Sequence, residues 1–446
     1  MKKIIYTVLL ALFTNCSPLL ERPEVVMPEW YRYGEDFSSD SLSIDLRWWE
    51  RFGDTTINRV VEQALYYNRD LRASLAKVDA SREYIAVAKA EFLPSIYLSA
   101  EAELYKINGV ETKELSTTPT LEWELSLFGK LRYTKADAVA EYLSQEWGYR
   151  AAVLSLSSEV VTALFTLAQY QESYQIAERS YELRVKATAL VDSLHRYGMS
   201  NGIALEQARS MVYSARSEMA KYRRAMEQAS LALNLLMGTS LSQTVELHTF
   251  TMPPDIPIGL PSELLERRPD VMESLYAMES AAMKVGIARA ERFPSITLTA
   301  DGGLVTETLT DLSSAKPFGW SLLGSVTQPI FNFGKLKRNE RMAYQNYVAS
   351  MNSYEQATLS ALNDVERALV AIATYRDELL ASRSTMVANA KISLTTTALY
   401  RSGMGDYLSV VDAERDLYSS QIEYAELRTQ QYINYITLIK ALGGGY

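Results

Sequence analysis

The chain carries the same sequence pattern twice, about two hundred residues apart. Residues 90–96 (AEFLPSI) return as residues 290–296 (AERFPSI), at an offset of 200. Residues 128–132 (FGKLR) return as residues 333–337 (FGKLK) at an offset of 205, which also relates Gly198 to Gly403. The extra residues therefore fall between Ala300 and Phe331. Because two units of this length cannot stack as short repeats do, the duplication predicts one body built from two similar halves.

The composition excludes several classes of function. The formal net charge is −9, which argues against a nucleic-acid partner. His195 and His248 are the only histidines and Cys16 is the only cysteine, so the chain has neither a cysteine/histidine zinc site nor an intramolecular disulfide. No run of eighteen apolar residues occurs, and we therefore predict no transmembrane helix. No catalytic constellation is present, so we predict a protein that is not an enzyme and uses no cofactor.

The N-terminus has the pattern of a targeting segment. Lys2 and Lys3 precede an apolar stretch over residues 4–13, and Cys16 follows closely. In that position Cys16 resembles the acylated first residue of a mature bacterial lipoprotein. We predict a lipoprotein signal peptide over residues 1–15 and lipidation of Cys16. An ordinary secretory signal that contains a cysteine is the alternative.

The periodicity in each half predicts a helix, two strands, a long helix and a further helix. A helical pattern runs from about 70 to 92 and should end at Leu93, because the residue before a proline is disfavoured in a helix. An alternating strand pattern follows from Ile96, then a polar loop over 108–118, then a second strand in which Leu121, Trp123, Leu125 and Leu127 share one face. The second half repeats the alternation near residues 296–300 and 320–326.

Two very long helices should follow the strands. No proline occurs between residues 130 and 196 or between 335 and 402. About 65 residues of helix extend roughly 100 Å, so each must lie against other helices along its length. Each should end in a glycine turn, at Gly198 and Gly403, from which a helix of about 35 residues returns. One long helix would then pack beside two short helices that are stacked end to end.

The strands predict an oligomer. Each has an apolar and a polar face, with aromatic residues near the ends, as in the strands of outer-membrane barrels. Four strands cannot close a barrel, since the smallest barrels have eight, whereas three chains would supply twelve. Glu122, Glu124 and Asp301 lie on the polar faces, and we expect them to point into the barrel lumen. The alternative is that one or two of them lie in extracellular loops.

Three motifs carry a resemblance to a known family. Residues 264–271 (LLERRPDV), 48–54 (WWERFGD) and 407–413 (YLSVVDA) are similar to motifs of the outer-membrane factor (TolC-like) family, in its lipoprotein branch of drug-efflux channels. In the first motif, Pro269 suits a first helical turn and Asp270 suits the positive end of the helix dipole. We therefore interpret that motif as structural.

The resemblance implies an α+β membrane protein in the bacterial outer membrane. A homotrimer would form a 12-strand β-barrel, with four strands per chain, continued by a long periplasmic α-helical barrel. The protein would be a passive exit duct for small molecules such as drugs and toxic compounds. Its partners would be a periplasmic adaptor protein and, indirectly, an inner-membrane efflux pump. The expected segments after the signal peptide are 16–66 (N-terminal and equatorial), 67–238 (first repeat), 239–265 (equatorial linker) and 266–446 (second repeat).

The resemblance also implies where the duct narrows. Asp412 occupies the position of an acidic residue that forms a ring at the constriction, where carboxylates attract cations and resist anions. Asp406, in the turn itself, is expected to contribute. The residues beside the two turns should dock the adaptor: Arg196, Tyr197, Gly198, Met199, Tyr400, Arg401, Gly403 and Met404. The alternatives are a solvated helix carboxylate at Asp412 and simple helix capping at the turns.

Two other functions remain open at this point. The first is the exit duct of a type I protein-secretion system, which shares the fold. The second belongs to another class, a lipid-anchored structural coiled coil of the periplasm. It would explain the long helices but not the amphipathic strands that recur in register with them.

Overall fold

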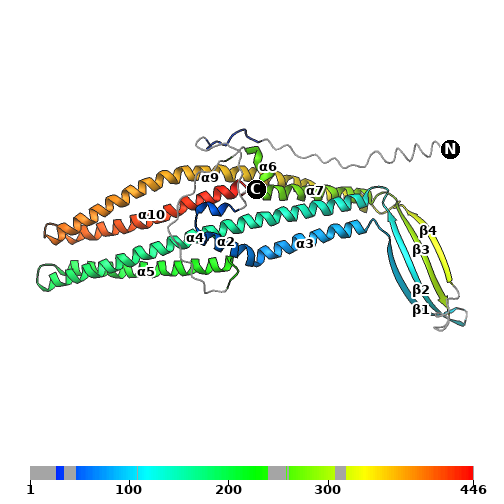
Figure 1. The fold of residues 1–446 in the computed structure, drawn as a ribbon, viewed down its shortest axis with the longest axis horizontal. Helices are drawn as coiled ribbons and strands as arrows, with labels where there is room; N and C mark the ends of the chain where they lie inside the picture. The colour runs from blue at the N-terminus through cyan, green and yellow to red at the C-terminus, as the bar shows by residue number, and fades with distance from the viewer. Residues whose placement is uncertain are drawn as a thin grey trace. The chain divides into compact units, whose positions relative to one another are not determined.

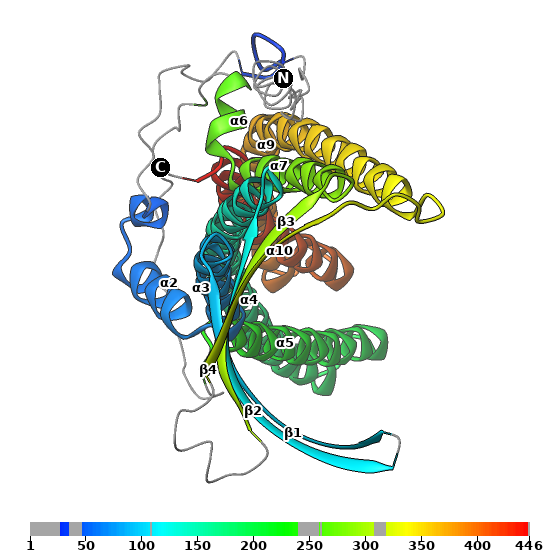
Figure 2. The same ribbon diagram turned by 90° about the vertical axis from the view of Figure 1, so that its right-hand side faces the viewer.

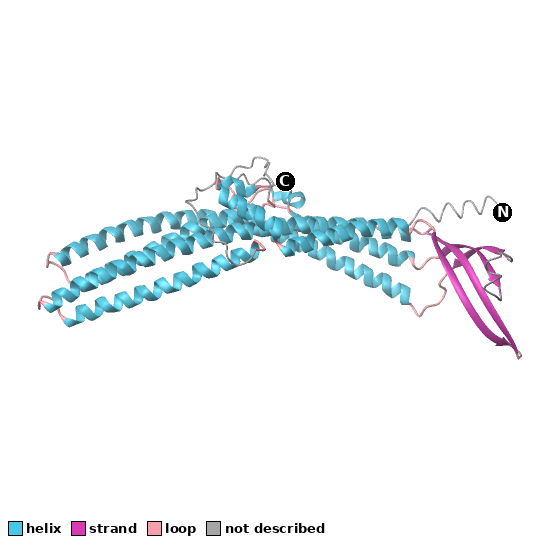
Figure 3. Ribbon diagram, turned by 60° about the horizontal axis from the view of Figure 1, so that its bottom comes forward, coloured by secondary structure: helices cyan, strands magenta, loops and turns pink. Residues whose placement is uncertain are grey.

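The computed structural model describes residues 27–34, 47–107, 109–239, 258, 261–306 and 318–444. The predicted signal peptide, Cys16, His248 and most of the predicted linker 239–265 lie outside these residues. The two halves have the predicted order of elements (Figure 1), and Figure 3 distinguishes the helices from the strands. The first half contains α2 (Thr55–Tyr67), α3 (Arg69–Ala90), β1 (Ser95–Ile107), β2 (Val110–Leu125), α4 (Lys130–Arg196) and α5 (Gly202–Leu236). The second contains α6 (Leu264–Arg267), α7 (Pro269–Ala290), β3 (Ser295–Thr306), β4 (Phe318–Thr327), α9 (Lys335–Arg401) and α10 (Tyr407–Ala441).

Three pairs of corresponding helices in the two halves have the same length. The long helices α4 and α9 each have 67 residues, and the returning helices α5 and α10 each have 35. The helices that enter the strands, α3 and α7, each have 22. The chain folds into two compact units, and each draws on both halves. The first contains residues 74–148 and 270–357, and the second contains the described parts of 26–73, 149–269 and 358–446.

The first unit contains an antiparallel sheet in the order β1-β2-β3-β4 (Figure 2). The predicted loop over 108–118 is wrong, because β1 runs to Ile107 and β2 begins at Val110. Gly109, with φ of +88°, takes the positive φ that the tight turn requires. The polar residues of this stretch are strand residues, and Lys106 forms an ion pair with Glu111 across the hairpin at 3.5 Å. Leu127 lies beyond β2, which ends at Leu125.

Around Ile96 and Tyr97 the register places polar and apolar residues in neighbouring rows across all four strands. Tyr97 lies opposite Thr120, which lies opposite Asp301, which in turn lies opposite Ser321, so these residues form one polar row. The neighbouring row is apolar and contains Ile96, Leu121, Ala300 and Leu322. Ile96 and Leu322 are 73% and 70% exposed in the single chain. Exposed apolar surface of this kind indicates a face that contacts lipid or another protein.

The second unit joins short helices end to end at two equivalent places. Gly238, just after α5, lies so close to α2 and α3 that a Cβ atom would be 2.6 Å from the carbonyl oxygen of Tyr67. Gly443, just after α10, lies equally close to Arg267, at 2.9 Å. The two pairs are related by the offsets that relate the halves. The predicted end-to-end stacking of short helices is therefore confirmed.

A polar side chain closes each junction, but the two halves use different residues. Asn68 donates from Nδ2 to the carbonyl oxygen of Leu236 at 3.0 Å, at the end of α5. Arg268 donates to the carbonyl oxygen of Ala441 at 3.1 Å, at the end of α10, and also binds Asp364 at 3.1 Å. These bonds satisfy helix-end carbonyls that have no partner within their own helix. The structural interpretation of the motif around Arg268 is confirmed.

The tryptophan pair of the N-terminal motif packs on the long helix. The short 3₁₀ helix η1 (Trp48–Phe52) buries Trp48, Trp49 and Phe52. The Trp48 indole donates to the Ser157 hydroxyl of α4 at 3.3 Å, and the Phe52 ring lies 5.2 Å from that of Phe165. Phe165 stacks on Tyr432 of α10 at 4.6 Å. An aromatic core thus ties η1 to α4 and α10.

Among the described helices, α4 contains a segment long and apolar enough to cross a membrane. Its average hydropathy is high although it contains no unbroken run of eighteen apolar residues, and the expectation of no transmembrane helix stays a prediction. Of that segment, 44% is buried within the chain. Val160, Val161 and Leu164 are among the buried side chains of α4. A core helix passes the same test of length and composition, so this is weak evidence for a membrane span.

Gly238→Ala should destabilise the protein much more than Gly53→Ala. Both glycines have positive φ, +64° and +67°, but only Gly238 has backbone atoms within 4 Å of the added methyl group. We expect a loss of about 2 to 4 kcal/mol at Gly238 and about 1 kcal/mol at Gly53. The thermal unfolding midpoint, followed by circular dichroism, measures both. Equal losses would mean that the close approach at the junction contributes nothing.

Candidate functional site: the helix turns and the polar sheet face

The two long helices end in the same turn. Gly198 and Gly403 have φ of +74° and +76°. Met199 N–H donates to the carbonyl of Leu194 at 2.8 Å, and Met404 N–H donates to that of Leu399 at 2.9 Å. This is the Schellman arrangement, in which a glycine reverses the chain and satisfies the last carbonyls of a helix. The sequence prediction of two glycine turns is confirmed.

The returning helices begin with equivalent caps of different charge. Asn201 caps α5 by accepting a bond from the Ala204 N–H at 2.8 Å. Asp406 takes the same position before α10, and the Ser409 hydroxyl donates to its carboxylate at 2.6 Å. The Ser409 hydroxyl lowers the pKa of Asp406. Asp406 is therefore an anchored, ionised carboxylate in the turn.

The two turns pack against one another through an apolar cluster. Val191, Ala204, Leu205 and Ala208 of the first hairpin contact Tyr407 and Val410 of α10. Tyr400 of α9 packs on this cluster, with its ring 5.2 Å from that of Tyr407. Burial raises the pKa of Tyr407 to about 12, so its hydroxyl stays neutral. Of the predicted docking residues, Tyr400 is thus part of the packing between the turns.

The other predicted docking residues lie on the surface. Tyr197, Met199, Arg401 and Met404 are exposed. Arg196 forms an ion pair with Asp192 one turn earlier on α4. Exposed methionines and tyrosines offer adaptable apolar contact to a partner.

Asp412 lies one turn and a half into α10 and is half-exposed. Its carboxylate is 3.0 Å from the Arg415 guanidinium, which also lies 3.7 Å from Asp416. Sequence reasoning did not consider Arg415, although its spacing of three residues from Asp412 is the spacing of helical ion pairs. Both side chains are exposed to solvent, so Arg415 screens the charge of Asp412 without removing it.

A buried ion pair joins α4 to α10 above the turns. The Arg184 Nε atom is 3.9 Å from the Glu414 carboxylate, which is an ion-pair distance but too long for a hydrogen bond. Arg184 also donates to the carbonyl of Met211 at 3.3 Å and lies over the Tyr418 ring. Burial lowers the pKa of Arg184. Burial raises the pKa of Glu414, and Arg184 opposes that rise. No sequence signal connects two residues 230 positions apart.

The three predicted lumen carboxylates share one face of the sheet. Glu122 and Glu124 of β2 lie opposite Thr299 and Thr297 of β3, on the same face as Asp301. Each has a polar partner: Tyr97 donates to Glu122 at 3.4 Å, Lys130 to Glu124 at 3.0 Å, and Ser321 to Asp301 at 3.1 Å. Lys130 belongs to the repeated FGK motif, so the motif places a positive charge beside Glu124 at the end of β2.

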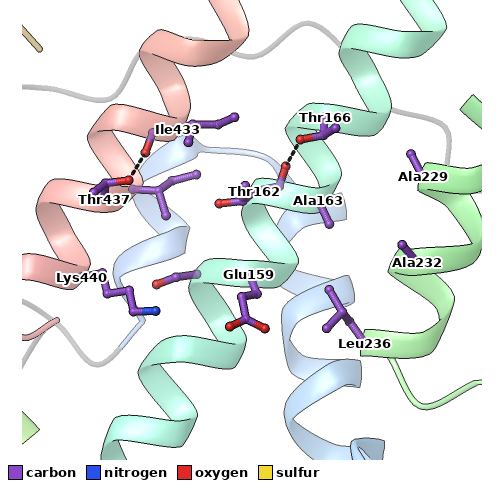
Figure 4. A pocket seen from close by; sticks show the side chains of 12 residues that line it. Glu159, Thr162, Ala163, Thr166, Ala229, Ala232, Leu236, Ile433, Thr437 and Lys440 are labelled. Carbon is purple, nitrogen blue, oxygen red and sulfur yellow. Dashed lines mark hydrogen bonds between the residues drawn. The ribbon is translucent and has the colours of Figure 1, made fainter. Parts of the chain in front are cut away.

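A groove in the second unit is lined by α4, α5 and α10 (Figure 4). Two of its hydroxyls bind their own helices, since Thr166 donates to the Thr162 carbonyl at 2.9 Å and Thr437 to the Ile433 carbonyl at 2.8 Å. Glu159 and Lys440 supply its charges. Half of its lining residues are alanine, leucine or isoleucine, and its other uncharged residues are serine and threonine. The described part of the chain holds no group of three or more acidic, histidine or cysteine residues that could bind a metal.

The model of one protein family, "Outer membrane efflux protein", matches residues 60–239 and 260–444. The chain belongs to the outer membrane efflux protein family. It is 31% identical to the cation efflux system protein CusC of Escherichia coli strain K12, over 100% of this chain and 99% of CusC. It is also 31% identical to the probable outer membrane lipoprotein SilC of Salmonella typhimurium, over 98% and 97%. The crystal structure of the open state of the Neisseria gonorrhoeae MtrE outer membrane channel superposes with a TM-score of 0.85, at 27% identity over 96% and 98%.

The family assignment confirms the sequence prediction of fold and function. This outer membrane efflux protein is an outer-membrane channel component of tripartite efflux systems, and such channels are not enzymes. The assignment favours efflux over both the protein-secretion duct and the structural coiled coil. The matches on residues 60–239 and 260–444 correspond to the two halves recognised in the sequence.

Arg184→Met should make the stability of this efflux protein depend on pH. Without Arg184, the buried Glu414 carboxyl holds its proton to a higher pH than in the unfolded chain, so stability falls as the pH rises through that range. We expect near wild-type unfolding at pH 5 and a loss of about 1 to 3 kcal/mol at pH 8. Thermal unfolding at the two pH values measures this. The double variant Arg184→Met/Glu414→Gln should lose the pH dependence, and an equal loss at both pH values would contradict the assignment to Glu414.

Proposed function

We propose that three copies of this chain form a lipid-anchored outer-membrane duct that passively conducts small toxic compounds delivered by a periplasmic adaptor and an inner-membrane pump. The open edges of the four-stranded sheet are the observation that supports a trimer. Among the described residues, β1 and β4 each pair on one side only, and the sheet has an exposed apolar face. A closed barrel has no open strand edge. Three chains with four strands each supply twelve strands, which are enough to close a barrel. The apolar face would contact lipid, and Glu122, Glu124 and Asp301 would face the lumen.

The turns are proposed as the periplasmic entrance. Asp412 of three copies would form an acidic ring, with Asp406 close by in the turn. Arg415 limits the charge of the ring because it lies within 3.0 Å of Asp412. A partly neutralised ring attracts cations yet binds them weakly enough to let them pass. CusC is named for cation efflux, and an acidic entrance would suit such a substrate class.

The adaptor is proposed to dock on the exposed rim of the turns. Tyr197, Met199, Arg401 and Met404 supply that rim, whereas Arg196 is held by Asp192 and Tyr400 by Tyr407. Gly198 and Gly403 would set its backbone shape. Cys16 is proposed to carry the lipid anchor, as the name of SilC suggests for a relative of similar length.

Single-channel conductance in planar bilayers tests the duct and its constriction. A charge a few ångströms from a passing ion is worth about 1 kcal/mol in water, so Asp412→Asn should lower the cation-to-anion permeability ratio by up to about fivefold. Arg415→Gln should raise the ratio, because it removes the screening charge. Glu218→Gln, on α5 far from the turns in sequence, is the control and should change nothing. A permeability ratio that changes in neither the Asp412 nor the Arg415 variant would rule out the ring. Absence of conductance in all four proteins would count against the duct.

A further inference from the structure

We propose that basic side chains where the long helices meet the sheet bind the headgroups of anionic phospholipids at the edge of the membrane. This surface is called the basic belt here. It consists of two residues of α4, one residue just after α7 and two residues of α9, namely Arg132, Lys135, Arg292, Lys337 and Arg341. All five are exposed and belong to the first unit. The belt rests on the proposed function, in which the apolar face of the sheet contacts lipid.

Positive charge is concentrated where the two long helices begin. The chain as a whole carries a formal charge of −9, yet residues 128–136 contain three basic residues and no acid. Residues 333–341 contain four basic residues and one acid. The first turns of α4 and α9 hold no acidic residue, although the positive end of a helix dipole favours acids there. A bound anion would interact favourably with both the dipole and the basic side chains.

Most of the belt has no acidic partner within the described chain. Arg292 forms an ion pair with Glu340 of α9. The structure gives the other four belt residues neither an ion pair nor a hydrogen bond to any described residue. By contrast Lys130, at the start of α4, binds Glu124 at 3.0 Å. The belt therefore has cations left over to bind an anion from outside the chain.

Three of the belt residues line an open pocket between α7 and α9. The pocket has a volume of about 540 Å³, and its lining includes Arg292, Lys337, Glu340, Arg341 and Tyr344. The spacing of three and four residues places the α9 members on one side of that helix. Two guanidinium groups and one ammonium group outnumber the single carboxylate, which already pairs with Arg292. Such donors bind the oxygens of a phosphate group strongly.

The equivalent side of α4 stays open although α4 has a helix on either side. Arg82 of α3 donates to Tyr142 at 3.3 Å, and Ser280 of α7 donates to Asp137 at 2.6 Å. The two belt residues of α4 remain exposed beside both neighbours. Helices that enclose a lumen stand closer together on their inner side than on their outer side. In the proposed duct, the open side of α4 and the equivalent side of α9 would therefore face outward.

The belt lies at the depth expected of a headgroup layer. Val326 near the end of β4 and Phe331 in the segment that follows it are both exposed. At 1.5 Å per residue, Lys337 and Arg341 lie about 3 Å and 9 Å beyond the first residue of α9. The headgroup region on each side of a bilayer is about 5 to 8 Å thick. Cations at this depth would meet the phosphate of a lipid whose acyl chains cover the apolar residues.

The adjoining apolar surface favours a lipid over a free phosphate ion. A phosphate ion would use only the cations of the pocket and would leave Val326 and Phe331 uncovered. A phospholipid with net negative charge, such as phosphatidylglycerol, would use both surfaces. We therefore expect the belt to select anionic lipid from the leaflet beside the helices.

Lipid binding by the purified full-length protein tests the belt. Titration with short-chain phosphatidylglycerol in dodecyl maltoside, followed by native mass spectrometry, gives an apparent dissociation constant. Lys337→Gln/Arg341→Gln should raise this constant roughly 10- to 30-fold, because each basic residue beside an anionic lipid surface contributes about fivefold. The control Arg179→Gln/Lys186→Gln removes two exposed basic residues of α4 in the second unit and should leave the constant unchanged. Equal constants for the wild type and the belt variant would overturn the proposal.

A charge-conserving variant separates lost charge from lost structure. Lys337→Arg/Arg341→Lys keeps both positive charges and should bind phosphatidylglycerol within about threefold of the wild type. Circular dichroism checks that this variant and the belt variant are equally folded. A folded charge-conserving variant that binds as weakly as Lys337→Gln/Arg341→Gln would contradict recognition by charge.

Two further probes identify what the belt binds. Phosphatidylcholine has the same phosphate group but no net charge, and it should bind at least about fivefold more weakly than phosphatidylglycerol. Inorganic phosphate has the charge without acyl chains, and at equal concentration it should not displace phosphatidylglycerol. Equal binding of the two lipids, or displacement by inorganic phosphate, would overturn the assignment to an anionic lipid.

Conductance separates the belt from the proposed duct. With its side chains on the outer side, Lys337→Gln/Arg341→Gln should conduct with the wild-type ratio of cation to anion permeability. A changed ratio with unchanged lipid binding would place these side chains in the lumen and overturn the belt. Conductance without any preference for phosphatidylglycerol would remove the belt alone. A protein that prefers phosphatidylglycerol through the belt but does not conduct would remove the duct and support the belt.

Discussion

The arrangement depends on two glycines at the ends of the returning helices. Gly238 and Gly443 bring the backbone of one short helix against the start of the next, at distances that no side chain could occupy. A long helix needs an apolar partner along its whole length, and two short helices provide one only if their ends meet without a gap. Asn68 and Arg268 then bind the carbonyls that the junction removes from water. At each junction a glycine allows the close approach and a polar side chain binds a helix-end carbonyl. The glycine is common to both halves, whereas the polar side chain is Asn68 in one and Arg268 in the other.

Three carboxylates of the described chain each lie beside a basic side chain. Lys130 binds Glu124, Arg415 lies beside Asp412, and Arg184 lies beside Glu414. At the proposed acidic ring, bare carboxylates would hold cations as well as attract them. The Arg415 guanidinium would weaken that binding, so the proposed ring would stay negative while a bound cation remained free to leave. The Arg184–Glu414 pair has the longest separation of the three, 3.9 Å, and is the most buried. Removing one of its partners would therefore leave a buried charge without a counter-charge.

Sequence patterns predicted the helices and turns that recur in both halves. They did not predict side-chain contacts between residues far apart in the chain. Periodicity and the spacing of glycine and proline predicted the long helices, the turns at Gly198 and Gly403 and the stacking of short helices. The loop over 108–118 was wrong because polar residues also occur on strands near a sheet end, where neither face is buried. Arg184 and Glu414 could not be paired, since nothing local marks two residues on different helices as neighbours. Asp406 lies in the turn as predicted, at the N-cap position of α10, and its carboxylate accepts a bond from the Ser409 hydroxyl.

The position of the five extra residues shows how strongly the sheet constrains the chain. An odd number of residues inserted within a strand would turn every following side chain to the opposite face. The offset is still 200 at Ser295 and is already 205 at Thr327, and the pairing of β3 with β4 is continuous up to Leu304 and Phe318. The insertion therefore lies between Leu304 and Phe318, at the connection of the two strands. There it leaves unchanged the polar row that contains Asp301 and the apolar row that contains Leu322. A duplicated chain of this kind can change length at such a connection without disturbing either the polar or the apolar row of the sheet.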